Sequence, residues 1–189
     1  MAQQEEIIYA KGRIFEIVQL PKPDGRVFEV ARRAPGVRVI IADLKQKQLL
    51  LTREHRWELG AYDYRLPGGK VFDTLEEYEA HRQSGEEILT VAAEKAKGEA
   101  AEEAGIDISE VTLFKKSSLG ATVEWDLFVF VATKWQLHPD GQNLKEDEQA
   151  GIEVNWYDFA KVEQMILAGE MQEERVALVL LQWLKNISH

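Results

Sequence analysis

The sequence predicts an α+β fold, in which a mixed β-sheet is covered by a few helices. Three observations support this class. The first part of the chain is rich in strand-forming runs separated by turn residues, whereas Glu86–Ala104 has the composition of a long helix. The second half returns to strands and ends in two helical segments. A three-layer sandwich around the same sheet is the alternative description of this element order.

Two hairpins are expected near the N-terminus. Arg13–Leu20 and Arg26–Ala31 are β-rich and flank a turn that contains two prolines and Asp-Gly, which is typical of a hairpin. Val37–Ala42 and Gln48–Thr52 are nearly continuous apolar runs, as expected of a more buried hairpin. We expect residues 1–35 to form an N-terminal β-hairpin segment and residues 36–189 to form the main domain.

The helices and later strands follow from periodicity and end signals. Glu86–Ala104 carries a small apolar stripe on one helical face, and Gly105 is well placed for a left-handed helix end. Asp73–Ser84 is polar and reads as a short helix or a mobile loop, after an aromatic loop that precedes Pro67. The remaining predicted elements are three strands followed by two helices: Val111–Lys116, Glu124–Thr133, Ile152–Trp156, Asp158–Leu167 and Glu174–Lys185.

Composition limits the classes of function. The chain has 189 residues, no cysteine and a net charge of −10, so disulfides and thiolate metal sites are excluded. An acidic surface argues against a nucleic-acid backbone as the main partner. No apolar run is long enough to span a bilayer and no secretory signal is recognisable, so we expect a cytoplasmic protein without a membrane partner.

An acidic cluster near the end of the long helix is the strongest chemical signal. Glu99, Glu102 and Glu103 stand at relative positions 0, +3 and +4, which places them on one helical face. Like charges so close repel one another unless a cation lies among them, so a divalent-metal site is one hypothesis. A solvated acidic surface is the other, and it is the commoner fate of such clusters.

The surrounding motifs resemble those of the Nudix hydrolases. Gly69 matches the opening glycine of their signature, and Glu99-Ala-Ala-Glu102-Glu103-Ala-Gly105-Ile106 matches its second half. Three flanking segments resemble the branch that hydrolyses ADP-ribose and nucleotide sugars, and with the N-terminal hairpin they extend the resemblance over most of the chain: Arg53-Glu-His-Arg56, Ser118-Leu-Gly-Ala-Thr-Val-Glu124 and Glu146-Asp-Glu148. The resemblance implies a Nudix fold, an α/β/α sandwich around a mixed sheet with an N-terminal β-hairpin extension.

The sequence departs from the family pattern in four features, which are one spacing and three residues. Gly69 and Glu99 are 30 positions apart, about twice the family spacing, which indicates an insertion of the kind that surface loops tolerate. Gly98 stands where the family has an arginine that orients a catalytic glutamate; Lys95 or Lys97 is a potential substitute. The mid-signature glutamate position falls on Thr90, with Glu86, Glu87 or Glu94 as alternatives in a shifted register, and Leu119 replaces a proline.

The resemblance assigns roles to named residues. It implies that Glu99, Glu102, Glu103 and the backbone carbonyl of Gly68 bind Mg²⁺ or Mn²⁺, which prefer hard oxygen ligands. The general base would be Glu146 or Glu148 in the later acidic loop, with Glu102 and Glu103 as alternatives. Arg53 or Arg56 would bind phosphate and Glu124 would contact the substrate or support the site, although surface ion pairs are an equally simple role for either arginine.

The implied reaction is hydrolysis of the pyrophosphate bond in a nucleoside diphosphate linked to a sugar or similar group. The products would be a nucleoside monophosphate and a sugar phosphate, and the N-terminal hairpin implies a homodimer. Two alternatives stay open. One is a Nudix-fold binding or regulatory protein with weak or no hydrolysis, and the other is a housekeeping hydrolase acting on free nucleoside triphosphates.

Overall fold

The computed structural model describes residues 5–144 and 151–187, and its centre is a six-stranded mixed sheet. The strands run in the order β12-β5-β4-β10-β8, with β6 paired to β5. Only the β4–β10 pair in this sheet is parallel. The sheet consists of β4 (Gly36–Asp43), β5 (Gln48–Arg56), β6 (Ala61–Arg65), β8 (Thr112–Ser117), β10 (Leu127–Ala132) and β12 (Glu153–Asp158).

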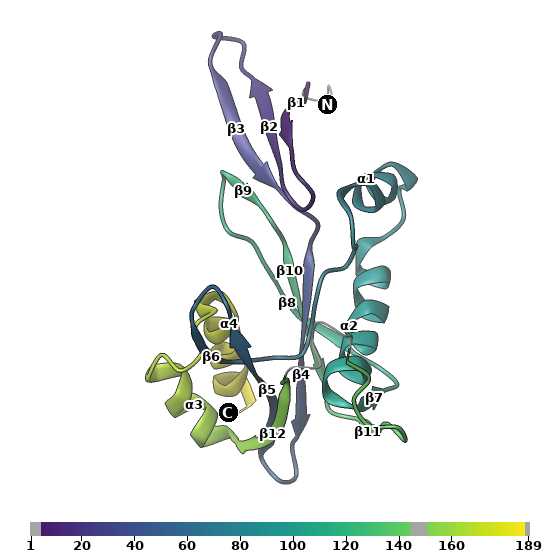
Figure 1. Cartoon of the computed structure of the whole chain (residues 1–189), viewed down its shortest axis with the longest axis vertical. Helices are drawn as coiled ribbons and strands as arrows, with labels where there is room; N and C mark the ends of the chain where they lie inside the picture. The colour runs from purple at the N-terminus through teal and green to yellow at the C-terminus, as the bar shows by residue number, and fades with distance from the viewer. Residues whose placement is uncertain (1–4, 145–150, 188–189) are drawn as a thin grey trace.

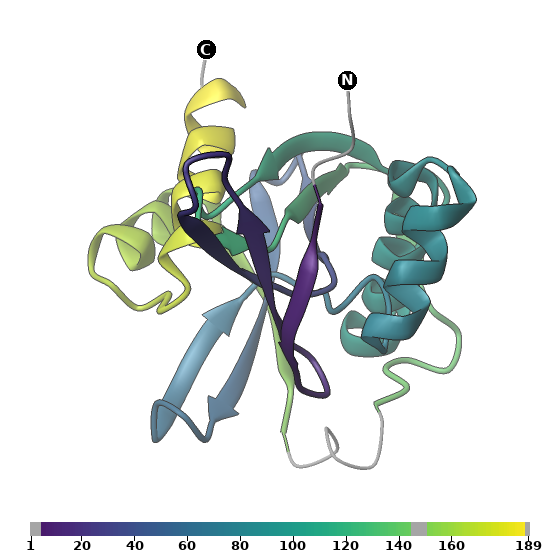
Figure 2. The ribbon, with the colours of Figure 1, turned by 90° about the horizontal axis from the view of Figure 1, so that it is seen from above.

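Helices cover both faces of this sheet (Figures 1 and 2). On one face lies α2 (Ile88–Ala104), preceded by α1 (Leu75–Ser84); on the other lie α3 (Phe159–Leu167) and α4 (Glu174–Ile187). Successive side chains of β4 point to opposite faces: Val39 packs with the alanines of α2, and Ile40 packs with α3 and α4. The predicted α+β class, as a three-layer sandwich, is confirmed.

A second sheet lies at the N-terminal end of the molecule (Figure 1). Its order is β1-β2-β3-β9, from β1 (Ile7–Lys11), β2 (Glu16–Pro21), β3 (Val27–Arg32) and β9 (Val123–Glu124). The predicted first hairpin is confirmed as the antiparallel β2–β3 pair, with Gly25 at a φ of 82° in its turn. Because β9 comes from the later chain, this sheet joins the N-terminal segment to the main body.

Four strands of the structure differ from what the sequence predicted. The aromatic segment after Arg56 is not a loop throughout, since β6 pairs with β5 and places Tyr64 opposite Arg53. The short strands β7 (Ile106–Ile108) and β11 (Trp135–Leu137) form a two-stranded sheet beside α2. The N-terminal strand β1 was also missed.

The predicted helix boundaries agree closely with the structure. The long helix ends at Gly105, whose φ of 63° is the expected left-handed conformation. The polar segment after Asp73 does form a helix, because the Thr74 side chain accepts a hydrogen bond from the Glu77 amide and Gly85 ends it at a φ of 74°. No helix among the described residues is both long and apolar enough to cross a membrane.

Candidate active site

The loop Pro67-Gly68-Gly69 is fixed between β4 and α2. The Val39 amide donates to the Pro67 carbonyl and the Val37 amide donates to the Gly69 carbonyl, both at 2.9 Å. Gly68 has a φ of 150°, and a Cβ there would lie 2.9 Å from the Arg38 Cα. Glycine is therefore required at Gly68 by the backbone conformation and by the close approach of β4.

Two carboxylates of α2 face this loop. The Gly68 amide donates to Glu103 Oε2 at 2.8 Å. At Gly69 a Cβ would lie 2.7 Å from Glu99 Cδ, so this glycine leaves room for the buried Glu99 carboxylate. Lys95 Nζ lies 3.1 Å from Glu99 Oε1. Since Lys95, Glu99 and Glu103 are each four positions apart, one helical face presents all three to the loop.

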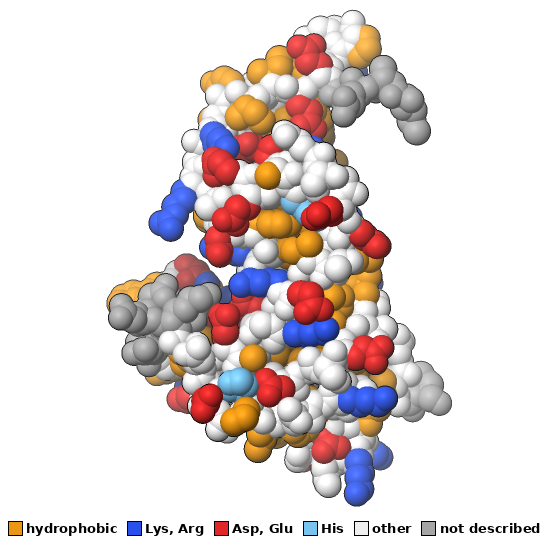
Figure 3. Space-filling view, turned by 90° about the vertical axis from the view of Figure 1, so that its right-hand side faces the viewer, with side chains coloured by type: hydrophobic (Ala, Val, Ile, Leu, Met, Phe, Trp, Pro, Cys, Tyr) orange, Lys and Arg blue, Asp and Glu red, His pale blue; other side chains and the backbone are white. Residues whose placement is uncertain are grey.

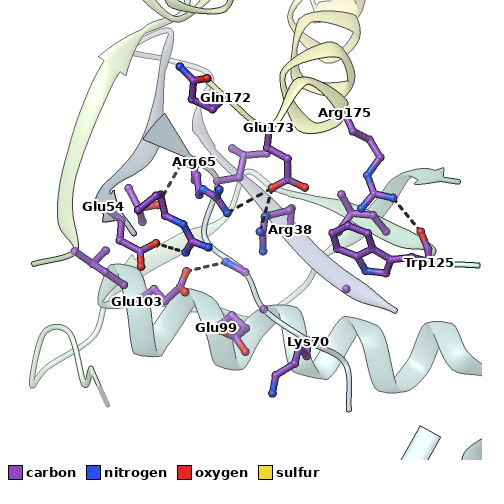
Figure 4. Close-up of a pocket in the computed structure, with 18 of the residues that line it drawn as sticks. Arg38, Glu54, Arg65, Lys70, Glu99, Glu103, Trp125, Gln172, Glu173 and Arg175 are labelled. Atoms are coloured by element: carbon purple, nitrogen blue, oxygen red, sulfur yellow. Dashed lines mark hydrogen bonds and ion pairs between the residues drawn. The ribbon is translucent and has the colours of Figure 1, made fainter. Parts of the chain in front are cut away.

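These groups line a cavity of about 700 Å³ between α2 and the start of α4 (Figure 4). Of the residues predicted for the site, Gly68, Glu99, Glu103 and Arg56 belong to its wall. The general-base candidates Glu146 and Glu148 lie outside the described residues. Three predicted residues do not line this cavity: Arg53, Glu102 and Glu124.

The three residues away from the cavity have other surroundings. Arg53 lies 3.0 Å from Glu153 and stacks over Tyr62, with its guanidinium 3.8 Å from the ring centre. The hydrogen bond to Glu153 raises the pKa of Arg53. Glu124 forms an ion pair with Arg32 at 3.0 Å in the N-terminal sheet. The backbone carbonyl of Glu102 accepts from the Asn143 amide.

Arg56 pairs with two further carboxylates of the cavity wall. Its guanidinium lies 3.1 Å from Glu54 and 2.7 Å from Glu58, and both acids line the same cavity. Burial lowers the pKa of Arg56, but the hydrogen bond to Glu58 and the charge of Glu54 outweigh it, so the net shift is upward. The sequence interpretation passed over Glu54, although strand alternation from Arg56 places these two side chains on the same face of β5.

The donor set fits a divalent cation. Mg²⁺ in proteins is commonly held by one or two carboxylates together with substrate phosphates and water, and Glu99 and Glu103 supply two such oxygen donors beside the Gly68 backbone. The described part of the chain contains no cluster of three acidic or histidine side chains in metal-binding geometry. As far as the described residues go, a cation bound by Glu99 and Glu103 would leave coordination positions open to substrate or solvent.

Gly98 is not explained by close packing. Apart from the adjoining residues and the backbone of its own helix, no atom of the described residues lies within 4 Å of the position that a Cβ would occupy there. Of the two lysines considered as substitutes for the missing arginine, Lys95 contacts Glu99, whereas Lys97 pairs with Glu94 at 2.8 Å. Lys95 is thus the basic residue that holds a site carboxylate in this structure.

An arginine-rich wall forms another part of the cavity, and the sequence interpretation missed it. Arg38 lies 3.2 Å from Glu173, and Arg65 lies 3.7 Å from the same Glu173 oxygen. Arg65 also contacts the fully buried Asp63 at 2.7 Å. The available signal was Arg38 itself, because a charged residue interrupts the otherwise apolar strand Val37–Ala42.

Basic and acidic side chains both line the cavity, and they are also interspersed on the face that carries α1 and α2 (Figure 3). Within the cavity, Arg33, Arg38 and Arg175 gather at the end that holds Trp125. In a chain of net charge −10, this local group of arginines offers an anionic ligand cations with which to pair.

One of three comparisons with known proteins found a match, and it concerns the fold. No protein-family model and no curated protein matched the sequence. Among solved structures, the chain is similar to an ADP compounds hydrolase, with a TM-score of 0.62, 21% sequence identity and coverage of 98% of this chain and 97% of that chain. The likeness extends over the N-terminal sheet as well as the sandwich. The chain therefore has the Nudix fold that its motifs implied.

Proposed function

We propose that this protein is a metal-dependent Nudix-type pyrophosphohydrolase. Its substrate would be a nucleoside diphosphate linked to a sugar or similar group, and the products would be a nucleoside monophosphate and a sugar phosphate. One observation carries the proposal: Glu99 and Glu103 converge on the Gly68-Gly69 loop in a cavity that also contains several arginines. The solved hydrolase of ADP compounds with the same fold is consistent with this substrate class.

Each residue of the site has a separate role in the proposed reaction. Glu99 and Glu103 would hold Mg²⁺ or Mn²⁺, which when bound neutralises phosphate oxygens and activates water. The Gly68 amide keeps the Glu103 carboxylate turned toward the loop. Arg56 also lines the cavity, where Glu54 and Glu58 hold its guanidinium, and it would contact a phosphate oxygen there. Glu146 or Glu148 stays our prediction for the general base.

The decisive experiment combines a substrate panel with one matched pair of variants. Purified protein with Mg²⁺ or Mn²⁺ should release phosphatase-sensitive product from ADP-ribose or a nucleotide sugar. Glu103→Gln should abolish release because it removes a metal-binding charge at constant size. Glu94→Gln makes the same change on an exposed part of the same helix, and it should retain full activity. Equal activity of the two variants would refute the assigned role of Glu103.

A binding protein without efficient hydrolysis is the second candidate. The Lys95 ammonium already lies against Glu99, where it competes with a metal cation, and Gly98 replaces the arginine of the family signature. Nucleotide-sugar binding without turnover across the whole panel, with either metal, would favour this candidate over the enzyme.

We further propose that the N-terminal sheet mediates a homodimer. Strand β1 lies at the edge of that sheet and exposes Ile7, Ile8 and Tyr9, whose relative exposures are 44%, 48% and 69%. An unpaired edge with apolar side chains favours association. Light scattering should give a dimer mass, and Tyr9→Lys combined with Ile8→Glu should convert it to a monomer mass; a monomeric wild type would refute the dimer.

A further inference from the structure

The side chain of Trp125 is enclosed by two guanidiniums at one end of the cavity (Figure 4). Arg33 lies 4.3 Å from the indole ring centre and Arg175 lies 4.2 Å from it. Arg175 also donates to the Trp125 carbonyl at 2.9 Å. With two cations stacked on its ring, Trp125 is poorly placed to stack on a nucleobase and instead holds two arginines in fixed positions.

Three arginines gather around this tryptophan. Arg33, Arg38 and Arg175 line this end of the cavity with the neighbouring carboxylates Glu173 and Glu174, and Glu173 is also shared with Arg65. Burial is the first cause that lowers the pKa values of Arg33 and Arg175, and repulsion from Arg38 lowers both further. The attraction of Glu173 opposes this repulsion; it is the weaker of the two at Arg33 and the stronger at Arg175. An anion in the cavity would relieve this repulsion.

Unpaired polar atoms are concentrated in the same place. Among the described residues, Arg38 Nε, Trp125 Nε1 and Arg175 Nη2 are buried donors without a hydrogen-bond partner, and Glu173 Oε1 is a buried acceptor without one. Buried polar groups in native proteins are normally paired. Three donors beside one acceptor match a phosphate group with a neighbouring hydroxyl, because phosphate oxygens only accept and a hydroxyl can donate to a carboxylate.

We propose that Arg33, Arg38, Trp125, Glu173 and Arg175 form a sugar-phosphate subsite. This inference rests on the proposed function and deepens it, since it assigns these residues to the phosphorylated sugar half of the substrate. Arg38, Arg175 and the Trp125 N–H donate to the phosphate oxygens. Glu173 Oε1 accepts from a sugar hydroxyl, and Arg33 contributes positive charge from its position 4.3 Å from the indole ring centre.

Binding of the sugar-phosphate product tests the subsite without any turnover. Calorimetric titration in EDTA should show that the wild type binds ribose 5-phosphate and does not measurably bind ribose. Arg175→Gln should weaken ribose 5-phosphate binding about ten- to a hundredfold, as expected for loss of a charged hydrogen bond. Arg26→Gln is the matched control, because Arg26 is exposed in the β2–β3 turn and pairs only locally with Asp24; its affinity should equal that of the wild type.

Glu173→Ala separates ligand recognition from a merely structural role. Loss of this carboxylate removes a negative charge, so inorganic phosphate should bind more tightly than to the wild type. The preference for ribose 5-phosphate over inorganic phosphate should disappear, because the acceptor for the hydroxyl is gone. A variant that was simply damaged would bind both probes more weakly, which would count against the assignment of Glu173.

The outcomes distinguish this proposal from the hydrolase proposal. Absence of ribose 5-phosphate binding in a wild type that hydrolyses nucleotide sugars would overturn the subsite alone. Unchanged affinity in Arg175→Gln would do the same, and Arg38→Gln provides the equivalent test if Arg175→Gln does not fold. Binding of ribose 5-phosphate that depends on Arg38 and Arg175, in a protein without hydrolytic activity, would support the subsite while overturning the hydrolase.

Discussion

Replacing Gly98 by alanine should stabilise the protein. Gly98 lies in the interior of α2, and apart from the adjoining residues and the backbone of its own helix no atom of the described residues lies within 4 Å of its missing Cβ, so a methyl group enters open space. Glycine costs about 1 kcal/mol relative to alanine in a helix interior. The free energy of unfolding should therefore rise by about 1 kcal/mol, which corresponds to about 2–4 °C in Tm for a chain of this size.

Urea unfolding followed by tryptophan fluorescence measures this change. The midpoint should shift upward with an unchanged m-value, because the surface exposed on unfolding is nearly the same. Gly105→Ala is the opposing control: Gly105 has a φ of 63° and its Cβ would lie 2.9 Å from the Gly141 carbonyl carbon, so this variant should be destabilised. A Gly98→Ala midpoint at or below that of the wild type would refute the reasoning.

The same position tests the departure from the family signature. Gly98→Arg should fold at least as well as the wild type, since arginine is also a good helix former and the space is open. We expect its turnover to match the wild type, because Lys95 already holds Glu99. A gain of about tenfold or more, equivalent to about 1.4 kcal/mol in the activation barrier, would contradict this role of Lys95.

Three further perturbations have definite expected outcomes. Gly69→Ala should fold but lose metal affinity and turnover, measured by calorimetry and kinetics, because its Cβ displaces the Glu99 carboxylate; unchanged metal binding would contradict this. Arg32→Met should lower the free energy of unfolding by about 3–5 kcal/mol in urea titrations, since Glu6, Glu16 and Glu124 lose the buried cation that they share and Arg82, the further cation near them, lies 3.7 Å from Glu6. The hydrogen bond to Arg32 lowers the pKa of Glu6 below its ordinary 4.5, so this carboxylate stabilises the fold above that pH and the contribution is lost as the pH falls through the folded pKa. Glu6→Gln should accordingly have a lower free energy of unfolding than the wild type in urea at pH 7. If the two proteins differ by the same amount under acidic conditions, ionisation of Glu6 does not contribute to stability as stated.

Local sequence signals predicted much of the fold because the forces involved are themselves local. Helix α2 and its end at Gly105 follow from periodicity and from the conformational freedom of glycine. The β2–β3 hairpin follows from its turn residues. Strand β6 was missed because its aromatic residues pair with β5 in a way that composition alone does not indicate.

In the candidate site, too, local spacing predicted some residues correctly, whereas long-range contacts decided the others. Glu99 and Glu103 were predicted from their spacing on one helix, and both line the cavity. Glu124 and Arg53 were expected there by resemblance, yet the structure pairs them with Arg32 and Glu153. The residues next to Glu124 and Arg53 in the sequence do not indicate these ion pairs, because each pair joins distant parts of the chain.

By itself, the sequence determined the α+β class, the acidic face of α2 and the glycine loop that precedes it. These features depend on the side-chain period, which is two residues in a strand and 3.6 residues in a helix. They also depend on the backbone conformations that each residue type prefers. Only the tertiary structure decided that Arg38, Trp125 and Arg175 meet in one cavity. Their positions in the chain are far apart, and packing of the sheet against α2 and α4 brings them together.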